Sequence, residues 1–282
     1  MSTIDLGKLP APQVVEPLDF EAELASMQAR VVELLPEMAA VITLESEPAN
    51  KLLQVFAYQK VLMQARVNDA AHACMLAYAS GADLDHLAAL LAVERLDGEA
   101  DARLRNRAQM ALEGETVAGS VGSYIFHALS ASAQVKDAAV DSPTPGTVRV
   151  TILANSGDGT PSAQLIATVQ AALSAQDVRP LSDLVHVEAA QIVPFSVNAV
   201  LDIYPGPAGA PLLAAAQAAL DAYLTDHARL GYDITLSGLY AALHQPGVQR
   251  VRLASPAADI PISANQAAHC TAINLSIGVV DV

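Results

Sequence analysis

The sequence predicts an α+β protein in which an all-helical N-terminal module is followed by two related small α+β units. Apolar residues recur at spacings of three and four through the N-terminal third, which is typical of amphipathic helices. Farther along, a strand, a Gly/Pro turn and a helix follow one another twice, over 148–175 and again over 197–222, and both helices contain Gln-Ala-Ala-Leu. Neither copy carries a reactive cluster, so the sequence favours a scaffold with contact surfaces over an enzyme.

Composition narrows the function further. Hydrophobic residues make up 52% of the 282 residues but aromatic residues only 4%, so we expect a core of Ala, Leu and Val. The formal charge of −15 opposes binding to nucleic acid, whose backbone is also negative. No apolar run of about 18 residues predicts a membrane span, and no secretory signal is visible. The sequence contains two cysteines, Cys74 and Cys270, and so low a number fits a reducing cytoplasm. We expect both to be packing thiols, and a disulfide or metal pair is the alternative.

The segment 1–18 is predicted to be an extended arm, because Pro10, Pro12 and Pro17 exclude a regular helix. Such an arm can lie on a neighbouring molecule or fold back on its own domain, and the sequence leaves both open. Asp19 is expected to cap a helix that begins directly after it and ends or kinks at the next proline.

One long helix dominates the N-terminal third. Ser46 ahead of Pro48 marks its start, and the apolar spacing continues to Gly81. Leu52 and Phe56 belong to the apolar residues of this helix, and we name them as candidate contacts with a partner.

The helical module, predicted over 19–115, ends with a basic segment. After a helix that Asp83 is expected to cap, a further helix carries Arg103, Arg105 and Arg107, the only dense basic run in this acidic chain. Their alternate spacing spreads the three side chains around the helix. In one alternative the three arginines are solvated or form salt bridges within the chain. In the other they dock an acidic neighbour, and the sequence leaves both open.

The two α+β units are predicted over 116–192 and 193–282. The first places a short helix and a strand ahead of its repeat. The second begins with its repeat, and a weaker echo of that helix and strand follows from Leu236, so the order of elements is altered between the copies. The segment 273–280 is predicted to be the last strand.

No catalytic residue, cofactor site or metal site is predicted. The seven histidines are scattered, and none forms the i, i+4 pair of a zinc protease. The turn at 119–122 lacks the spacing of a nucleophile elbow, and the turn at 156–161 lacks the Gly-Lys-Ser/Thr ending of a phosphate loop. Arg179, near Asp177 and Asp183, either ties a loop or positions a substrate carboxylate, and we keep it as a candidate contact residue.

Six dispersed segments, in the right order and spanning nearly the whole chain, resemble the baseplate assembly protein J family of contractile-tailed phages and R-type pyocins. The segments are LPAPQVVEPLDFEAEL, TLESEPANKLLQVFAY, RVNDAAHACMLAYASGADLDHLA, AGSVGSYIFHALSA, DVRPLSDLVHVEAA and the stretch from YPGP to YAALHQPGVQRVRL. Between Arg95 and Asp101 the chain departs from the family, because it is shorter there than the members it resembles.

The resemblance implies a structural part of the baseplate wedge. Such a protein would associate with itself, in two or more copies per wedge of a six-fold ring. It would also contact a second wedge protein, the hub or spike and sheath-proximal baseplate proteins. It would assemble in the bacterial host cytoplasm and pass on the rearrangement that triggers sheath contraction, without cofactor, nucleic acid or membrane. A tail-associated hydrolase and a small-ligand binding module are the alternatives.

Overall fold

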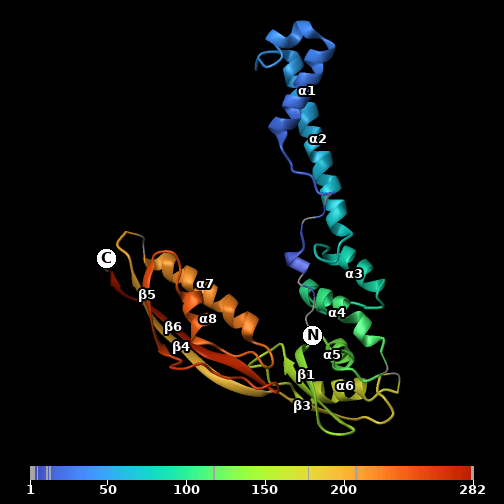
Figure 1. Cartoon of the computed structure of the whole chain (residues 1–282), viewed down its shortest axis with the longest axis vertical. Coiled ribbons are helices and arrows are strands. Elements are labelled where there is room, and N and C mark those ends of the chain that lie inside the picture. Colours follow the sequence, from blue (N-terminus) through green and yellow to red (C-terminus); the bar gives the residue numbers. More distant parts are fainter. Residues whose placement is uncertain are drawn as a thin grey trace. The chain divides into compact units, whose positions relative to one another are not determined.

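The computed structural model describes residues 4, 6–10, 12, 14–116, 118–176, 178–206 and 209–280. Over these residues the chain forms eight α-helices and six strands in two sheets, and the first five helices precede every strand (Figure 1). The predicted α+β class, with a helical N-terminal module ahead of two small α+β units, is confirmed. Two compact units result, which we call the helical unit (Met1–Arg95 with Ala100–Gln109) and the α+β unit (Leu96–Glu99 with Met110–Val282). Within the described residues, no helix combines the length and apolar character that a membrane span requires.

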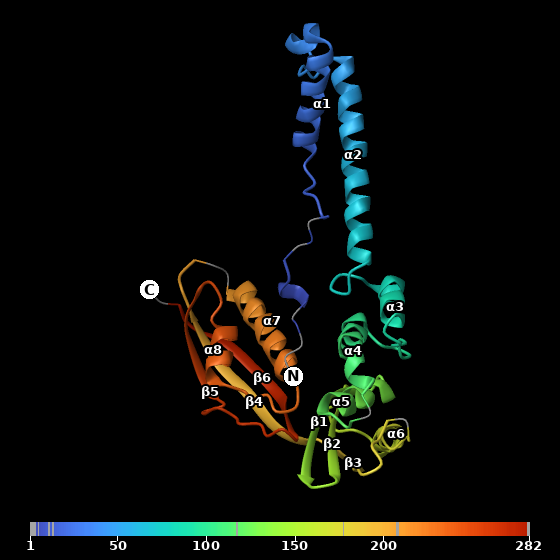
Figure 2. The same cartoon turned by 45° about the vertical axis from the view of Figure 1, so that its right-hand side comes forward.

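Two helices of the helical unit lie side by side, α1 (Phe20–Leu34) and α2 (Pro48–Ala73) (Figure 2). Asp19 caps α1 as predicted, because its side chain accepts a hydrogen bond from the Ala22 amide at 3.0 Å. Two short 3-10 helices also belong to this part of the chain, η1 (Leu6–Lys8) and η2 (Pro36–Ala40).

The predicted continuation of the long helix to Gly81 is wrong. α2 ends at Ala73, where the chain turns. The carbonyls of Leu76 and Ala79 accept hydrogen bonds from Arg105 at 2.7 and 2.6 Å. The guanidinium of Arg105 therefore binds carbonyls that backbone amides would bind if the helix continued. The apolar residues after Ala73 keep the helical spacing but lie outside the helix.

The predicted start of the long helix agrees with the structure, whereas the predicted Asp83 cap is wrong. α2 begins at Pro48, and Glu47 occupies its cap position. Asp83 lies within the first turn of α3 (Gly81–Ala89), and the first amide of that helix donates to the carboxylate of Asp101 at 3.0 Å instead. A carboxylate distant in sequence thus provides the negative charge that a helix N-terminus favours. The next helix is α4 (Asp101–Gly114).

The first sheet has the order β1-β2-β3, in which β1 is antiparallel and β3 parallel to the central strand. Its elements in chain order are α5 (Val121–Ala131), β1 (Val135–Thr144), β2 (Thr147–Ala154), α6 (Ala163–Leu173) and β3 (Leu184–Ala189). Tyr124 of α5, Ile152 of β2 and Leu173 of α6 are buried in one cluster, so both helices cover the same face of the sheet.

The second sheet has the order β5-β4-β6, in which β5 is antiparallel and β6 parallel to the central strand. Its elements in chain order are β4 (Gln191–Ile203), α7 (Gly209–His227), α8 (Leu236–Leu243), β5 (Val248–Ser255) and β6 (Gln266–Val280). Leu201 of β4, Leu220 of α7 and Leu239 of α8 are buried together, and again both helices cover one face.

The two sheets share one pairing pattern but differ in chain order. Each has a central strand followed by a helix, β2–α6 or β4–α7, and these are the two repeats of the sequence. Each sheet also has a capped helix followed by the antiparallel strand. In the first sheet this pair, α5–β1, precedes the repeat β2–α6, and in the second sheet the pair α8–β5 follows the repeat β4–α7. The parallel strand, β3 or β6, comes last in both. The altered order is therefore a permutation of one arrangement.

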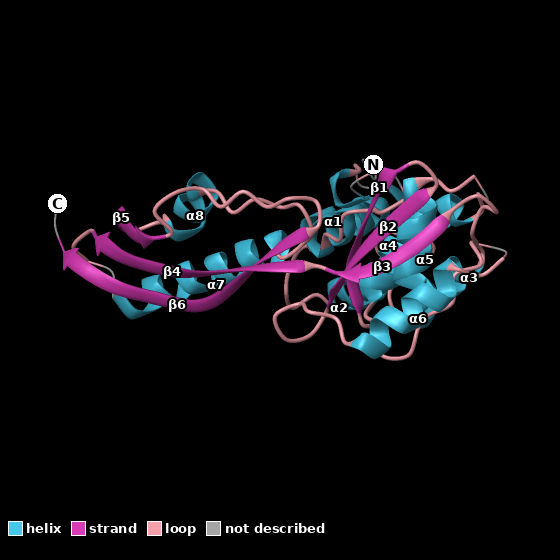
Figure 3. Ribbon diagram, turned by 90° about the horizontal axis from the view of Figure 1, so that it is seen from below, coloured by secondary structure: helices cyan, strands magenta, loops and turns pink. Residues whose placement is uncertain are grey.

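The chain passes directly from β3 of the first sheet into β4 of the second (Figure 3), and backbone hydrogen bonds continue across this junction. Ala190 alone separates β3 from β4, and its amide donates to the carbonyl of Ile152 at 3.0 Å. The next amide, of Gln191, donates to the carbonyl of Asn265 at 3.0 Å. Four buried side chains pack at this junction: Leu153, Ala190, Leu230 and Ala267. The two sheets consequently form one body.

Substitution of a core leucine tests this packing. Leu173→Ala should lower the free energy of unfolding by about 2–5 kcal/mol, because it removes a fully buried side chain between α6 and the first sheet. Leu181→Ala is the matched control, since Leu181 is 98% exposed, and it should change the stability little. Chemical denaturation of both variants measures the difference, and equal stabilities would contradict the described core.

Candidate interaction surfaces

Six apolar side chains form an exposed stripe on α2 of the helical unit, which we call the α2 stripe. Its six residues share one helical face and are each between 45% and 66% exposed. They are Leu52, Val55, Phe56, Leu62, Met63 and Val67. Both contact residues that the sequence predicts on this helix, Leu52 and Phe56, lie in the α2 stripe. A helix of a lone globular domain normally turns such a face inward.

The opposite face of α2, which is turned into the unit, buries two asparagines. Its buried residues are Asn50, Ala57 and Asn68. Gln28 of α1 donates to the Asn50 side chain at 2.9 Å, and Asn50 in turn donates to the carbonyl of Leu44 at 3.1 Å. Hydrogen bonds and a small side chain therefore help to hold α2 within the unit, while the six side chains of the α2 stripe point away.

The N-terminal arm lies on its own helical unit. Asn68 of α2 clamps the backbone of Glu16, accepting from its amide at 3.0 Å and donating to its carbonyl at 2.8 Å. Gln109 of α4 donates to the carbonyl of Ile4 at 3.0 Å. Of the two alternatives for the arm, this structure contains the folded-back one.

A groove of about 480 Å³ lies beside this clamp. Glu16 and Glu23 supply its carboxylates, and the side-chain amide of Gln64 donates to them at 3.2 and 2.8 Å. Lys60 binds Glu23 at 2.5 Å and holds the pKa of that carboxyl below its ordinary value. The charged groups of the groove are paired with neighbours, so the groove serves the attachment of the arm.

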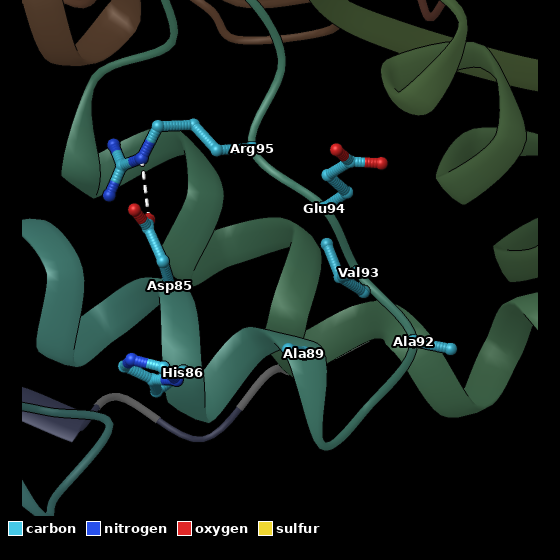
Figure 4. A pocket seen from close by; sticks show the side chains of 7 residues that line it. All are labelled: Asp85, His86, Ala89, Ala92, Val93, Glu94 and Arg95. Atoms are coloured by element: carbon cyan, nitrogen blue, oxygen red, sulfur yellow. Dashed lines mark hydrogen bonds and ion pairs between the residues drawn. The ribbon is translucent and has the colours of Figure 1, made fainter.

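A second, open pocket of about 650 Å³ lies between α3 and residues 92–95 (Figure 4). Arg95 and Asp85 point toward one another across its wall, with Nε and Oδ1 2.6 Å apart, and a guanidinium nitrogen of Arg95 also lies 2.7 Å from Asp101. Asp85 raises the pKa of Arg95 above its ordinary value. The cation of this pocket is held by carboxylates of the same unit.

The arginine run on α4 is engaged within the helical unit. Arg105 donates to carbonyls as described above, and Arg107, only 3% exposed, donates to the carbonyl of Glu94 at 2.6 Å. Arg103 is partly exposed and also has a partner. For Arg105 and Arg107, contacts within the chain are therefore the alternative that the geometry favours.

Arg179 ties a loop of the α+β unit. Its Nη1 donates to the carbonyl of Asp183 at 3.0 Å, and the hydroxyl of Tyr124 donates to the carboxylate of Asp183 at 2.8 Å. Burial raises the pKa of Tyr124, which keeps the phenol a donor. The third member of the predicted cluster, Asp177, lies outside the described residues. The loop is thus fixed to α5, as expected if Arg179 acts as a tie.

Sequence reasoning missed a buried carboxylate with several partners, Asp202 of β4. It is 1% exposed and binds Arg250 at 2.9 Å, Arg252 at 2.6 Å and the amide of Val279 at 3.0 Å. One carboxylate thereby links the central strand to both of its neighbours. The signal available in the sequence was the alternation of the two arginines in Val248–Ser255, which places both on one face of a strand.

Side chains suited to a metal do not gather in the described part of the chain, where no group of three His, Cys, Asp or Glu could hold an ion. Both cysteines are free. The expectation that both are packing thiols is wrong for Cys74, which is exposed where the chain turns after α2. Cys270 is partly buried on β6.

Comparison with known proteins yields matches to the N-terminal, central and C-terminal parts of one family, in that order along the chain. Three family models match in succession: the baseplate J-like N-terminal domain over residues 45–99, the central domain over 116–189 and the C-terminal domain over 195–276. Baseplate protein J of Escherichia phage P2 is 46% identical over 298 aligned residues, which cover 99% of each chain. The chain belongs to the baseplate J-like family. The resemblance found in the sequence is confirmed, and the function class is that of a phage baseplate structural protein.

Family membership places the surfaces in context. The α2 stripe lies within the baseplate J-like N-terminal domain, and Asp202 lies within the C-terminal domain. The alignment with the phage P2 protein has more positions than this chain has residues, so that protein contains residues without a counterpart here. That the difference falls between Arg95 and Asp101 stays a prediction.

The Asp202 network predicts a pH-dependent stability. The Val279 amide, followed by Arg250 and Arg252, holds the pKa of Asp202 below its ordinary value of 3.8. The charged form therefore stabilises the fold above that ordinary value, and this contribution is lost as the pH falls toward the lowered pKa of the folded state. Asp202→Asn should lower the melting temperature at pH 7, and the gap to the unmodified protein should narrow between about pH 5 and pH 3.

Melting temperatures across this pH series measure the effect. Asp69→Asn serves as the control, because Asp69 is exposed on α2 and makes none of these contacts. A gap that stays constant with pH would contradict the described network.

Proposed function

We propose that this chain is a wedge component of the baseplate of a contractile phage tail or R-type pyocin, and that it works through surfaces rather than bond-making chemistry. The observation that carries the proposal is the α2 stripe. Burying an exposed Leu, Val, Phe or Met side chain is favourable by about 1.5–3 kcal/mol, and six such side chains share this face. A contiguous exposed apolar surface of this kind is typical of protein–protein interfaces.

The spacing of the stripe fits a helix bundle. Leu52, Phe56 and Met63, with Gln59 between the last two, follow intervals of four, three and four residues along α2. This is the heptad-like spacing with which helices interdigitate side chains in coiled-coil packing. We infer that residues 20–92 form the wedge core with helices of a second copy and of a second wedge protein.

The α+β unit suits a different part of the assembly. Its two sheets form one body through the junction at Ala190, so it can transmit a displacement rather than absorb it. In this proposal residues 120–253 make the contacts between wedges in a six-fold ring and toward the hub, spike and sheath-proximal proteins. The chain would then assemble in the bacterial host cytoplasm and pass on the rearrangement that starts sheath contraction.

No observation of comparable weight supports the two alternatives, a tail-associated hydrolase and a small-ligand binding module. A tail-associated hydrolase needs converging acid, base or nucleophile, and a ligand-binding module needs polar groups directed into a pocket. In the groove beside the arm, Glu16 and Glu23 bind Gln64 and Lys60, and in the second pocket Arg95 binds Asp85 and Asp101. Zymography on cell-wall substrate and thermal shifts with a ligand panel would reveal either activity.

Substitution of the stripe tests the proposal. The double variant Leu52→Ser and Phe56→Ser should abolish complexes with neighbouring tail proteins and reduce self-association, while the fold of the chain stays intact because both side chains are exposed. Tyr58→Ser is the matched control: Tyr58 is 54% exposed on the same helix but lies outside the stripe. Co-expression followed by size exclusion with light scattering gives the masses. Complexes that survive the double variant would contradict the proposal.

A further inference from the structure

The outer edge of β6 is open along most of its length. β6 is the outermost strand of the second sheet, with β4 on its inner side (Figure 3). Near its start, Leu230 forms a bridge to Ala267. Among the described residues, no strand or bridge pairs with the outer side of β6 beyond that point. The backbone groups of a long strand are consequently available to another chain.

This edge lacks the features by which proteins prevent strand pairing. From Gln266 to Val280, β6 contains no Asp, Glu, Lys, Arg or Pro. The opposite edge, β5, carries Arg250 and Arg252 and is followed by Pro256. Charges and prolines normally protect an exposed edge, and long uncharged edges attract a partner strand.

The apolar core is also incompletely covered at this edge. Ile273, Leu275 and Ile277 of β6 point to the α7 side, as their β4 neighbours Val197, Ala199 and Leu201 do. The three β4 residues are at most 1% exposed, whereas the three β6 residues are only partly buried. A further strand with apolar side chains on the same face would complete the core.

We propose that β6 pairs antiparallel with β6 of a second copy, around a two-fold axis at Leu275. The segment Ile273-Asn274-Leu275-Ser276-Ile277 has a palindromic pattern, with apolar residues on the α7 face and polar residues on the other. A two-fold axis at Leu275 sets Ile273 opposite Ile277 of the copy and Asn274 opposite Ser276 of the copy. Every pair then joins like with like, as a self-complementary interface requires.

A second copy suits this edge better than an unrelated partner. Two copies that each carry a formal charge of −15 repel one another, and contact is least unfavourable along a segment without charged side chains. Residues flanking the palindrome also match: Ala272 meets Gly278, and Thr271 meets Val279, with no charge in either pair. The inference rests on the proposed function only in its demand for self-association, and it uses a different surface from the α2 stripe.

Charge substitutions on the polar face test the pairing. Asn274 and Ser276 are both exposed, so the single chain tolerates changes there. All variants carry Leu52→Ser and Phe56→Ser, so that association through the α2 stripe does not contribute. In this background we compare Ser276→Glu alone, Asn274→Glu with Ser276→Glu, and Asn274→Lys with Ser276→Glu. All three share the substitution at Ser276, so its effect on Arg252, whose guanidinium reaches β6 at Gly278, is constant.

The full-length chains are compared by light scattering across a concentration series. The background chain and the single Ser276→Glu variant should form dimers. The Glu/Glu pair places like charges opposite one another twice and should weaken the dimer about tenfold or more, whereas the Lys/Glu pair should restore it. A monomeric background chain, a dimer that tolerates Glu/Glu, or a Lys/Glu variant that remains monomeric would each overturn the inference. None of these outcomes bears on the α2 stripe, which the test of the proposed function addresses separately.

Discussion

The polar burial of α2 is the constraint on which the helical unit depends. Asn50 and Asn68 face inward and are satisfied by Gln28, Leu44 and the Glu16 backbone, which positions α1, the following turn and the arm. A buried amide without partners would cost about 1–3 kcal/mol, so these hydrogen bonds specify which face turns inward. The six apolar side chains of the α2 stripe then face outward. The inward orientation of Asn50 and Asn68 therefore also exposes the α2 stripe, the surface through which we propose that the chain assembles.

Much of the fold could be predicted because its elements follow local rules. Asp19 caps a helix where side-chain chemistry demands it, and the alternation in 148–154 and 197–203 predicts the two central strands. The errors arise where a distant group decides. α2 stops at Ala73 although its apolar spacing continues, and Arg105 and Asp101 satisfy the backbone beyond it from another helix. Periodicity contains no information on such long-range partners.

The candidate surfaces were predictable to a lesser degree. Helical spacing identified Leu52 and Phe56 as apolar, but only the structure reveals that their face is uncovered while asparagines are buried. Charge density drew attention to Arg105 and Arg107, yet both bind carbonyls of their own unit. Asp202 escaped notice because an isolated acidic residue in a strand carries no local sign of its partners on two neighbouring strands.

A comparison of the two permuted sheets explains why β6, and not β3, is left for pairing. β3 and β6 occupy the same place in their sheets, parallel to the central strand. β3 is short, and its Glu188 lies 3.6 Å from Arg149 on the exposed face, so charge marks that edge. The chain also continues from β3 into the centre of the second sheet, which ties that strand at its end. β6 closes the second sheet, is longer and lacks charge. Because β3 and β6 are the parallel edge strands of sheets with the same pairing pattern, the difference between them supports the strand pairing that we propose for β6.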